Sequence, residues 1–188
     1  MPDVLTESQI VEQLAVRVGQ EHRDAVVGRE VNLAWGSARI DLLALNGAVS
    51  GYEVKSARDS LARVSRQIEV YKKTLEFVTF VVAPVHLRGV RPLIPGWCGL
   101  IEVTSNDGHA SFVHRRQARR NPAADPREIC FFLSRIEIHK ELRRRGCDRL
   151  SGTPRHELVE MLIQQASTKE LWALSRDALN SRLRARSA

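Results

Sequence analysis

Residues 38–71 read ARIDLLALNGAVSGYEVKSARDSLARVSRQIEVY, and this stretch determines the fold class that we expect. Residues 39–45 and 48–55 each have the composition of a strand, and Asn46-Gly47 between them is a strong signal for a β-hairpin. Beyond them, apolar residues recur at spacings of three and four, which predicts a helix over 60–76 capped by Asp59 or Ser60. The stretch therefore predicts two antiparallel strands followed by a helix.

The flanking sequence extends this pattern in both directions. A first helix is expected over residues 6–18 with Thr6 as its N-cap, and a strand over 30–35. Residues 77–83 (FVTFVVA) form a nearly continuous apolar run, which is typical of a strand buried on both faces. The other expected core elements are a short helix over 86–93 and strands over 99–104 and 110–115.

Two prolines in residues 121–126 (NPAADP) indicate a boundary between two parts of the chain. We expect a core over 1–120 and a helical module over 127–188. The predicted fold class is α/β, with a mixed β-sheet flanked by helices and a basic helical extension at the C-terminus. The helices expected in that extension cover about 127–145, 155–166 and 168–185.

The net charge of +7 is concentrated in the C-terminal part of the sequence. Residues 1–110 carry 12 Lys or Arg and 13 Asp or Glu, whereas residues 111–188 carry 17 and 9. A polyanion such as DNA is the natural partner of such a surface, because cations that neutralise phosphates release counterions. The alternative is a solvated basic face without a partner. The arginine clusters contain Arg115, Arg116, Arg119, Arg120, Arg143, Arg144 and Arg145.

The sequence has no apolar run long enough to span a membrane and begins without a secretory signal, so we expect a cytoplasmic protein with no membrane partner. Its three cysteines, Cys98, Cys130 and Cys147, lie far apart and match no metal-ligand spacing. They are expected to be free thiols.

Asp41, Glu53 and Lys55 are the candidate catalytic residues. A carboxylate inside an apolar strand is costly unless it has a partner, and the period of a strand places Glu53 and Lys55 on one face. Two carboxylates and an ammonium on adjacent strands suit Mg²⁺ or Mn²⁺ bound together with a substrate phosphate. The alternative is a half-exposed hairpin whose charged side chains point into water.

The hairpin geometry sets a condition for this chemistry. A two-residue Asn46-Gly47 turn would pair Asp41 with Tyr52 and turn Glu53 to the opposite face. A three-residue loop over 45–47 with Gly47 left-handed, or a bulge at Gly51, would bring both carboxylates to the same face. We therefore predict one of these two irregularities.

Three further residues complete the pattern: Glu30 in the preceding strand, and Gln67 and Tyr71 one turn apart on the following helix. The ordered set, R-I-D-x₁₁-E-V-K followed by a helix with Q-I-E-V-Y and a buried strand, resembles the PD-(D/E)XK nuclease superfamily. The Gln-x-x-x-Tyr element is similar to that of its RecB-like and Cas4-like branch. Over residues 6–105 the chain also resembles a family of small stand-alone bacterial proteins that are linked to DNA repair.

The resemblance implies a restriction-endonuclease-like fold and a set of roles. The metal ligands would be Glu30, Asp41, Glu53 and the carbonyl group of Val54. Lys55 would serve the nucleophile, and Gln67 and Tyr71 would orient the site or the DNA. In this family the third carboxylate often comes from the first helix, so Glu12 or Glu21 could replace Glu30. Ile40 stands where the family name has proline, and no cysteines for an iron–sulfur cluster are present.

The C-terminal part has a second resemblance, to the SAP-type helix–extension–helix motif that binds DNA. It rests on residues 141–146 (ELRRRG) and 152–162 (GTPRHELVEML), with Thr153 as the expected cap and Pro154 at the first helical position. Leu142 and Leu150 would pack on Leu158 and Leu162. Arg143, Arg144, Arg145 and Arg155 would then contact phosphates without reading sequence.

These patterns predict a metal-dependent deoxyribonuclease that acts in DNA repair or in defence against foreign DNA. A different class of protein, a DNA-binding adaptor without catalytic activity on a nuclease-like fold, is the main alternative. The sequence leaves open whether the nucleic acid is single-stranded, duplex or branched, whether RNA replaces DNA, and whether the protein forms a homodimer.

Overall fold

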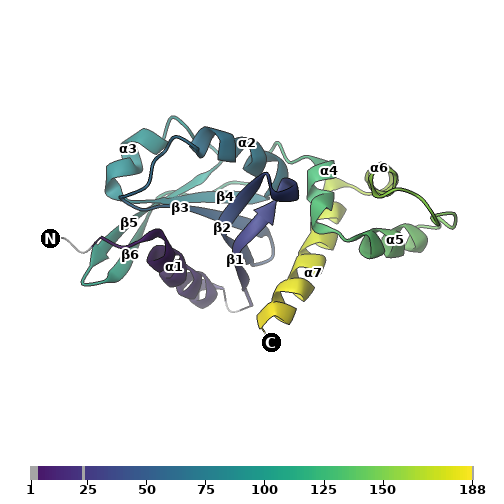
Figure 1. Cartoon of the computed structure of the whole chain (residues 1–188), viewed down its shortest axis with the longest axis horizontal. Helices are drawn as coiled ribbons and strands as arrows, with labels where there is room; N and C mark the ends of the chain where they lie inside the picture. Colours follow the sequence, from purple (N-terminus) through teal and green to yellow (C-terminus); the bar gives the residue numbers. More distant parts are fainter. Residues whose placement is uncertain (1–3, 23, 188) are drawn as a thin grey trace.

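A computed structural model describes residues 4–22 and 24–187, and its core is a six-stranded mixed sheet with helices on both faces (Figure 1). The strands lie side by side in the order in which they occur in the sequence. This arrangement confirms the mixed α/β class. The strands are β1 (Val26–Leu33), β2 (Ala38–Leu45), β3 (Val49–Lys55), β4 (Phe77–Val82), β5 (Gly99–Asn106) and β6 (His109–Arg116).

The strand directions divide the sheet into three parts. β1, β2 and β3 are antiparallel neighbours, β3, β4 and β5 run parallel, and β6 returns antiparallel to β5. A parallel pair needs a crossover connection, and α2 (Val64–Thr74) provides it between β3 and β4. The predicted strand at the start of the core begins at Val26 rather than at residue 30, because Val26 and Val27 pair with the end of β2.

Helix α1 (Glu7–Glu21) covers one face of the sheet. Thr6 is its N-cap, as predicted: the Thr6 hydroxyl accepts a hydrogen bond from the backbone N–H of Gln9, and the Gln9 side chain accepts from the Thr6 N–H. The apolar side of α1 then packs on the inner strands. The buried residues of this layer include Ile10, Leu14 and Val18 from the helix and Leu42, Val54, Val81 and Ile101 from the sheet.

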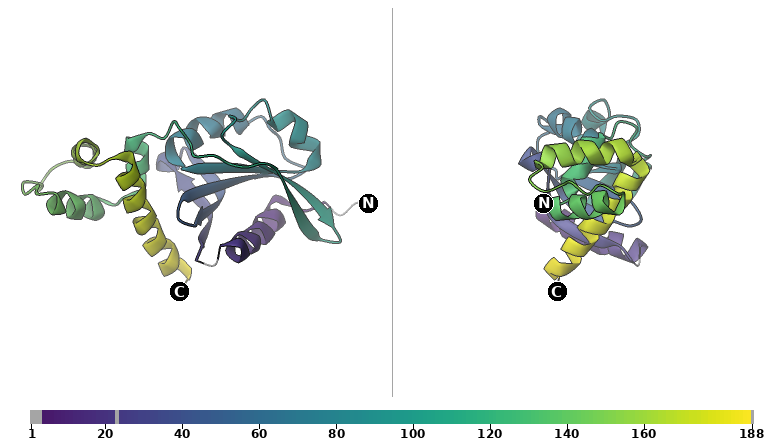
Figure 2. Two further views of the ribbon diagram at one scale, coloured as in Figure 1. Left: turned by 180° about the vertical axis from the view of Figure 1, so that it is seen from behind. Right: turned by 90° about the vertical axis from the view of Figure 1, so that its right-hand side faces the viewer.

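Helices α2 and α3 (Leu87–Val90) lie on the opposite face of the sheet (Figure 2). Of the predicted apolar positions, Val64, Ile68, Tyr71 and Leu75 are buried and Leu61 is partly buried. The helix begins at Val64 rather than near Ser60. The reason is local: the Asp59 carboxylate accepts hydrogen bonds from the backbone N–H and the hydroxyl of Ser56 and so closes the turn after β3. Asp59 therefore caps a turn and not the helix.

The C-terminal part is helical, as predicted, but the helix expected over 127–145 is broken. Its residues form α4 (Pro126–Ile129), a 3₁₀ turn and α5 (Arg135–Arg144). Ser134 and Glu137 form a capping box, which starts a new helix there. The last two helices are α6 (Arg155–Gln165) and α7 (Thr168–Ser187).

The predicted packing of Leu142 and Leu150 with Leu158 and Leu162 agrees with their complete burial in one apolar cluster. The cap of α6 is Pro154 without a side-chain hydrogen bond, so Thr153 is not the cap. No helix within the described ranges is long and apolar enough to cross a membrane.

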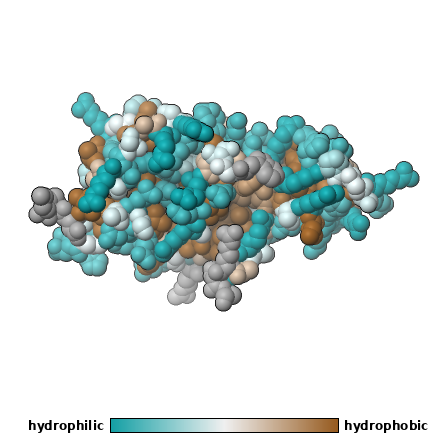
Figure 3. All heavy atoms as spheres, viewed as in Figure 1, coloured by the Kyte–Doolittle hydropathy of each residue, from teal (hydrophilic) through white to brown (hydrophobic). Residues whose placement is uncertain are grey.

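The helical module packs on the sheet through a core that continues from one part of the chain to the other. Gly28 in β1 lies against Leu183 of α7, so closely that a side-chain carbon at Gly28 would come within 2.7 Å of a Leu183 methyl group. The face of the molecule seen in Figure 3 is largely hydrophilic, with hydrophobic residues in separate patches at its middle and towards both ends. The proline-rich segment also joins the core, because the Asn121 side chain donates to the carbonyl oxygens of Lys72 and Leu75.

Glu76, between α2 and β4, ties the two parts together. Its side chain is fully buried, and it accepts a hydrogen bond from the backbone N–H of Val49 at 3.0 Å. Arg120 lies 2.6 Å from one carboxylate oxygen and Arg176 of α7 lies 3.3 Å from the other. A buried carboxylate with three cationic or N–H partners fixes the position of each of them.

We predict that Glu76→Ala lowers the free energy of unfolding by about 3–5 kcal/mol, because it leaves Arg176 and the Val49 N–H without their partner. Urea denaturation would measure the change. Glu69→Ala, which removes an exposed ion pair with Lys72, is the control and should cost less than about 1 kcal/mol. Equal effects of the two substitutions would contradict the anchoring role of Glu76.

Candidate active site

A cavity of about 300 Å³ opens at the carboxyl ends of β3 and β4, the edge of a parallel sheet at which α/β proteins commonly bind ligands. The start of β2, the end of β3 and the first residues of α1 and α2 surround it. Its lining brings together residues far apart in the sequence: Glu7, Ser37, Ala38, Arg39, Asp41, Glu53, Lys55, Arg63, Arg66 and Gln67.

The β2–β3 hairpin brings Asp41 and Glu53 together. Leu45 pairs with Val49, so the loop has three residues, 46–48, and Gly47 has a φ of +86°. The predicted three-residue loop is therefore present, but it lies one residue later than the predicted 45–47, and Leu43 faces Gly51. One step beyond the Leu42–Tyr52 pair, this register sets Asp41 opposite Glu53.

The strands are irregular at Asp41. Ile40 lies in the apolar layer beneath α2, whereas Leu42 lies in the layer beneath α1, so the ordinary alternation fails between them. In β1, Glu30 has a φ of +50° and interrupts the ladder beside Asp41. The Asp41 carboxylate instead accepts a hydrogen bond of 2.7 Å from the backbone N–H of Val54. This carboxylate thereby takes the place of a strand carbonyl.

Three side chains satisfy the buried carboxylate of Glu53, which is only 1% exposed. Its Oε1 accepts hydrogen bonds from Lys55 Nζ at 2.6 Å and from Gln67 Nε2 at 2.5 Å. Its Oε2 accepts from the Tyr71 hydroxyl at 2.5 Å. Gln67 and Tyr71 stand one turn apart on α2, which allows both to reach the same carboxylate. All four residues were predicted site residues, and the structure brings them together.

The remaining carboxylates of the cavity, those of Asp41 and Glu7, have raised pKa values. Burial, together with the nearby charge of Glu53, raises the pKa of the Asp41 carboxyl group from 3.8 to about 7. Burial also raises the pKa of Glu7, together with the charge of Asp59. The pKa of Tyr71 is raised by burial and by Glu53, so its hydroxyl keeps the proton that it donates. A cation would relieve the repulsion among the carboxylates.

Glu30 does not line the cavity. Its exposed carboxylate lies 3.2 Å from the guanidinium group of Arg39. The two alternatives considered from the sequence are also turned elsewhere: Glu12 faces Arg29 at 3.8 Å, and Glu21 pairs with Arg17. The third carboxylate in the cavity is that of Glu7, the first residue of α1. The capping signal at Thr6 places this residue at the start of the helix and could have pointed to it.

Most of the arginines predicted to bind nucleic acid already have protein partners. Arg115 pairs with Glu102, and Arg144 and Arg145 pair with Glu141. Carbonyl oxygens hold three others: Arg116 donates to Cys98 and Pro95, Arg119 to Gly96, and Arg155 to Cys130 and Leu133. With Arg120 bound to Glu76, only Arg143 of the predicted set is without a hydrogen bond or ion pair to a described residue. The cations of the cavity itself, Arg39, Arg63 and Arg66, were not predicted.

The cavity contains ligands that suit a hard divalent cation, although no three Asp, Glu, His or Cys side chains of the described residues converge closely enough to form a metal centre by themselves. The buried carbonyl oxygen of Gln67, with no hydrogen-bond partner among these residues, supports this fit. A cation, or water bound to it, would satisfy that oxygen together with Asp41 and Glu53.

The fold and the cavity define a mixed α/β protein with a candidate site at the carboxyl ends of its parallel strands, where carboxylates and cationic side chains meet. The chain belongs to the family described as Bacteriophage P4 protein cII, whose profile matches residues 5–188. Protein cII of Enterobacteria phage P4 is 28% identical over 148 residues, which are 79% of this chain and 56% of that protein. The chain thus spans just over half the length of this curated relative.

A solved structure of a protein of unknown function from Silicibacter pomeroyi is similar with a TM-score of 0.48 and 19% identity. The match covers 80% of this chain and 97% of that chain. None of the names found by these comparisons states an activity, so a functional proposal has to be argued from the cavity.

We predict that Asp41→Asn stabilises the metal-free protein at high pH. The carboxyl pKa is raised on folding, so ionisation favours the unfolded chain, and stability falls as the pH rises from about 4 through 7. Asn keeps the acceptor for Val54 but carries no charge. One pKa unit corresponds to about 1.4 kcal/mol, so the free energy of unfolding of the variant at pH 9 should exceed that of the unmodified protein by about 1–4 kcal/mol. Urea denaturation in EDTA at pH 4 and 9 tests this, and a gain that did not grow with pH would contradict it.

Proposed function

We propose that this protein is a divalent-metal-dependent DNA nuclease and that its sheet and helices form a restriction-endonuclease-like core. The observation that carries the proposal is the meeting of Asp41, Glu53 and Lys55 in one cavity. The order of elements also supports it, since a hairpin with these residues is followed by a helix with Gln67 and Tyr71 and then by the buried strand β4.

Mg²⁺ or Mn²⁺ is the proposed metal, and Asp41 and Glu53 would hold it, with the Val54 carbonyl group and Glu7 as further candidates. Oxygen ligands and retained water are what these ions prefer. When bound, the ion would make the attacking water more acidic and offset the charge that develops on the phosphate. The raised pKa of Asp41 supports this assignment, because a buried pair of carboxylates is relieved by a cation.

The other residues of the cavity have roles that follow from their contacts. The Lys55 ammonium, now bound to Glu53, would position the attacking water or stabilise the charge on the phosphate during the reaction. Arg39, Arg63 and Arg66 line the same cavity and would bind phosphate oxygens. Gln67 and Tyr71 are positioning residues, because they hold Glu53 through hydrogen bonds.

The proposed setting is DNA repair or defence against foreign DNA, in the cytoplasm, and it rests on the resemblance of the ordered residues to nucleases with such roles. Because the chain spans only part of its phage relative, the activity, substrates and partners of the whole protein belong to the same proposal. A homodimer is a further part of it.

Incubation of the protein with labelled single-stranded, duplex and branched DNA should give cleavage with Mg²⁺ or Mn²⁺ and none with EDTA. Lys55→Ala and Asp41→Asn should each reduce the rate at least about 100-fold, as expected for loss of a group that acts in the transition state. DNA binding should change little. Binding without cleavage under every metal would replace the nuclease by a non-catalytic DNA-binding adaptor, and full activity in both variants would reject the site.

Glu7 and Glu30 provide a matched pair of substitutions. Because only Glu7 lines the cavity, Glu7→Gln should weaken activation by Mg²⁺ at least several-fold, whereas Glu30→Gln should leave it unchanged. The metal concentration that gives half-maximal cleavage is the quantity to measure, alongside the rise in melting temperature caused by the metal alone. A larger effect of Glu30→Gln than of Glu7→Gln would identify Glu30, and not Glu7, as the third carboxylate of the site.

A further inference from the structure

Five exposed arginines lie at the cavity or in the segments that follow β3 and β4, and we call them the arginine rim: Arg58, Arg63, Arg66, Arg88 and Arg91. Arg63 and Arg66 line the cavity at the start of α2. Arg58 belongs to the preceding turn, and Arg88 and Arg91 to α3 and its end. All five follow the carboxyl ends of the parallel strands β3 and β4.

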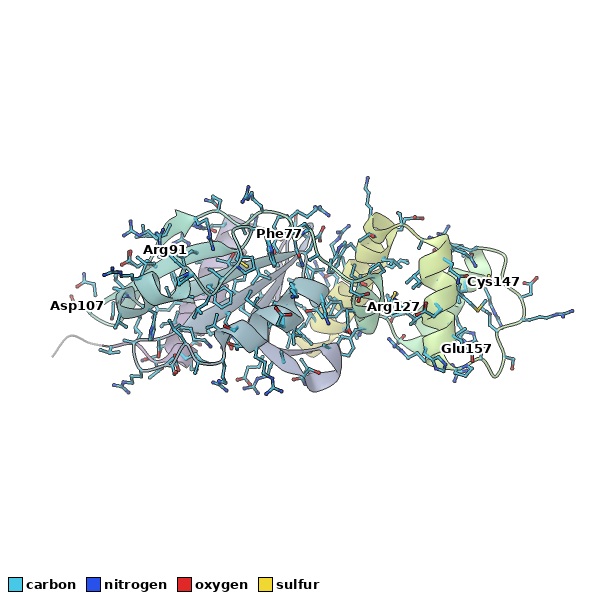
Figure 4. All side chains as sticks on the ribbon, turned by 90° about the horizontal axis from the view of Figure 1, so that it is seen from above. Phe77, Arg91, Asp107, Arg127, Cys147 and Glu157 are labelled. Carbon is cyan, nitrogen blue, oxygen red and sulfur yellow. The ribbon has the colours of Figure 1, made fainter. Side chains whose placement is uncertain are left out.

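Contacts between the loops show that the segments that carry the rim lie next to one another. The His86 ring lies 3.0 Å from the carbonyl oxygen of Ser56, which joins the segment before α3 to the turn after β3. Gly89 lies against Leu61, since a side-chain carbon there would be 3.0 Å from a Leu61 methyl group. Figure 4 looks onto these segments, with Arg91 at the end away from the C-terminal helices.

The rim is positively charged, and Glu7 in the cavity offsets part of the charge of Arg63. None of its five guanidinium groups has a hydrogen bond or ion pair to a residue within the described parts of the chain. The acidic residues nearby are occupied: Asp59 holds Ser56, Glu69 pairs with Lys72, and Glu76 is buried beneath Arg120. The C-terminal arginines differ, because most of them are neutralised by neighbouring carboxylates or held by carbonyl groups.

We propose that the arginine rim, and not the C-terminal arginine cluster, is the docking surface for the nucleic acid backbone. Phosphates next to the one in the cavity would contact Arg63 and Arg66, and those further along the strand would contact Arg58, Arg88 and Arg91. Contacts of these arginines with phosphates carry no sequence information, so binding would depend on charge and not on base sequence. This inference rests on the proposed nuclease function only for the phosphate inside the cavity.

Fluorescence anisotropy with a labelled 20-base-pair DNA duplex tests the proposal without cleavage, either in EDTA or with Mg²⁺ in the Lys55→Ala protein. Arg63→Ala/Arg66→Ala and Arg88→Ala/Arg91→Ala should each weaken binding at least about tenfold at low salt. The slope of log K against log salt should fall by about one for each phosphate that the variant no longer neutralises. A single strand and an RNA duplex of the same sequence show which nucleic acid the rim favours.

Arg143→Ala/Arg149→Ala is the matched control, because it also removes two exposed arginines without hydrogen bonds to described residues, but on the helical module. It should bind within about twofold of the unmodified protein. Three results would overturn the proposal. They are unchanged DNA affinity in the rim variants, a larger loss of affinity in the control variant, and no DNA binding by the unmodified protein. Binding lost in the rim variants of a protein that cleaves nothing would reject the nuclease and keep the docking surface.

Discussion

The buried carboxylate of Glu53 is the constraint on which the arrangement of the core depends. A charge that is almost completely removed from water must be satisfied by hydrogen bonds, and Gln67 and Tyr71 supply two of them from one face of α2. These bonds fix the rotation of the helix over β3. Gly51, on the same face of β3, allows the close approach, because a side chain there would collide with Leu75. A site at the end of the strand therefore determines the packing along its whole length.

The other two carboxylates of the cavity, those of Asp41 and Glu7, are less well satisfied than that of Glu53. Lys55 offsets one carboxylate, whereas Asp41 and Glu7 are held at raised pKa values by burial and by neighbouring carboxylates. Such repulsion lowers the stability of the metal-free chain, and folded proteins tolerate it mainly where a bound ion or substrate removes it. The same residues that cost stability would therefore create the affinity for a cation that we propose. This is the physical link between the fold and the proposed activity.

Local patterns predicted the elements of the fold well because each has a short-range cause. The apolar run before Pro84 gave a strand buried on both faces, and the capping signal at Thr6 gave the start of α1. The odd length of the hairpin loop, which brings Asp41 and Glu53 together, also followed from residue spacing, although the loop lies one position later than predicted. What could not be predicted depends on contacts between distant residues. Glu30 is turned outward by a positive φ and by Arg39, while the start of α1 carries Glu7 to the cavity.

The charge of this protein shows why composition and surface potential differ. The C-terminal part has the excess of arginine, but a buried Glu141 binds Arg144 and Arg145 there, and these pairs serve the packing of the module. The N-terminal part is nearly neutral by count, yet several of its carboxylates are buried, and the five arginines of the rim form no hydrogen bond or ion pair with a described residue. A polyanion meets the charge that remains unpaired at the surface. For that reason the part of the chain with the lower net charge carries the stronger argument for contact with nucleic acid.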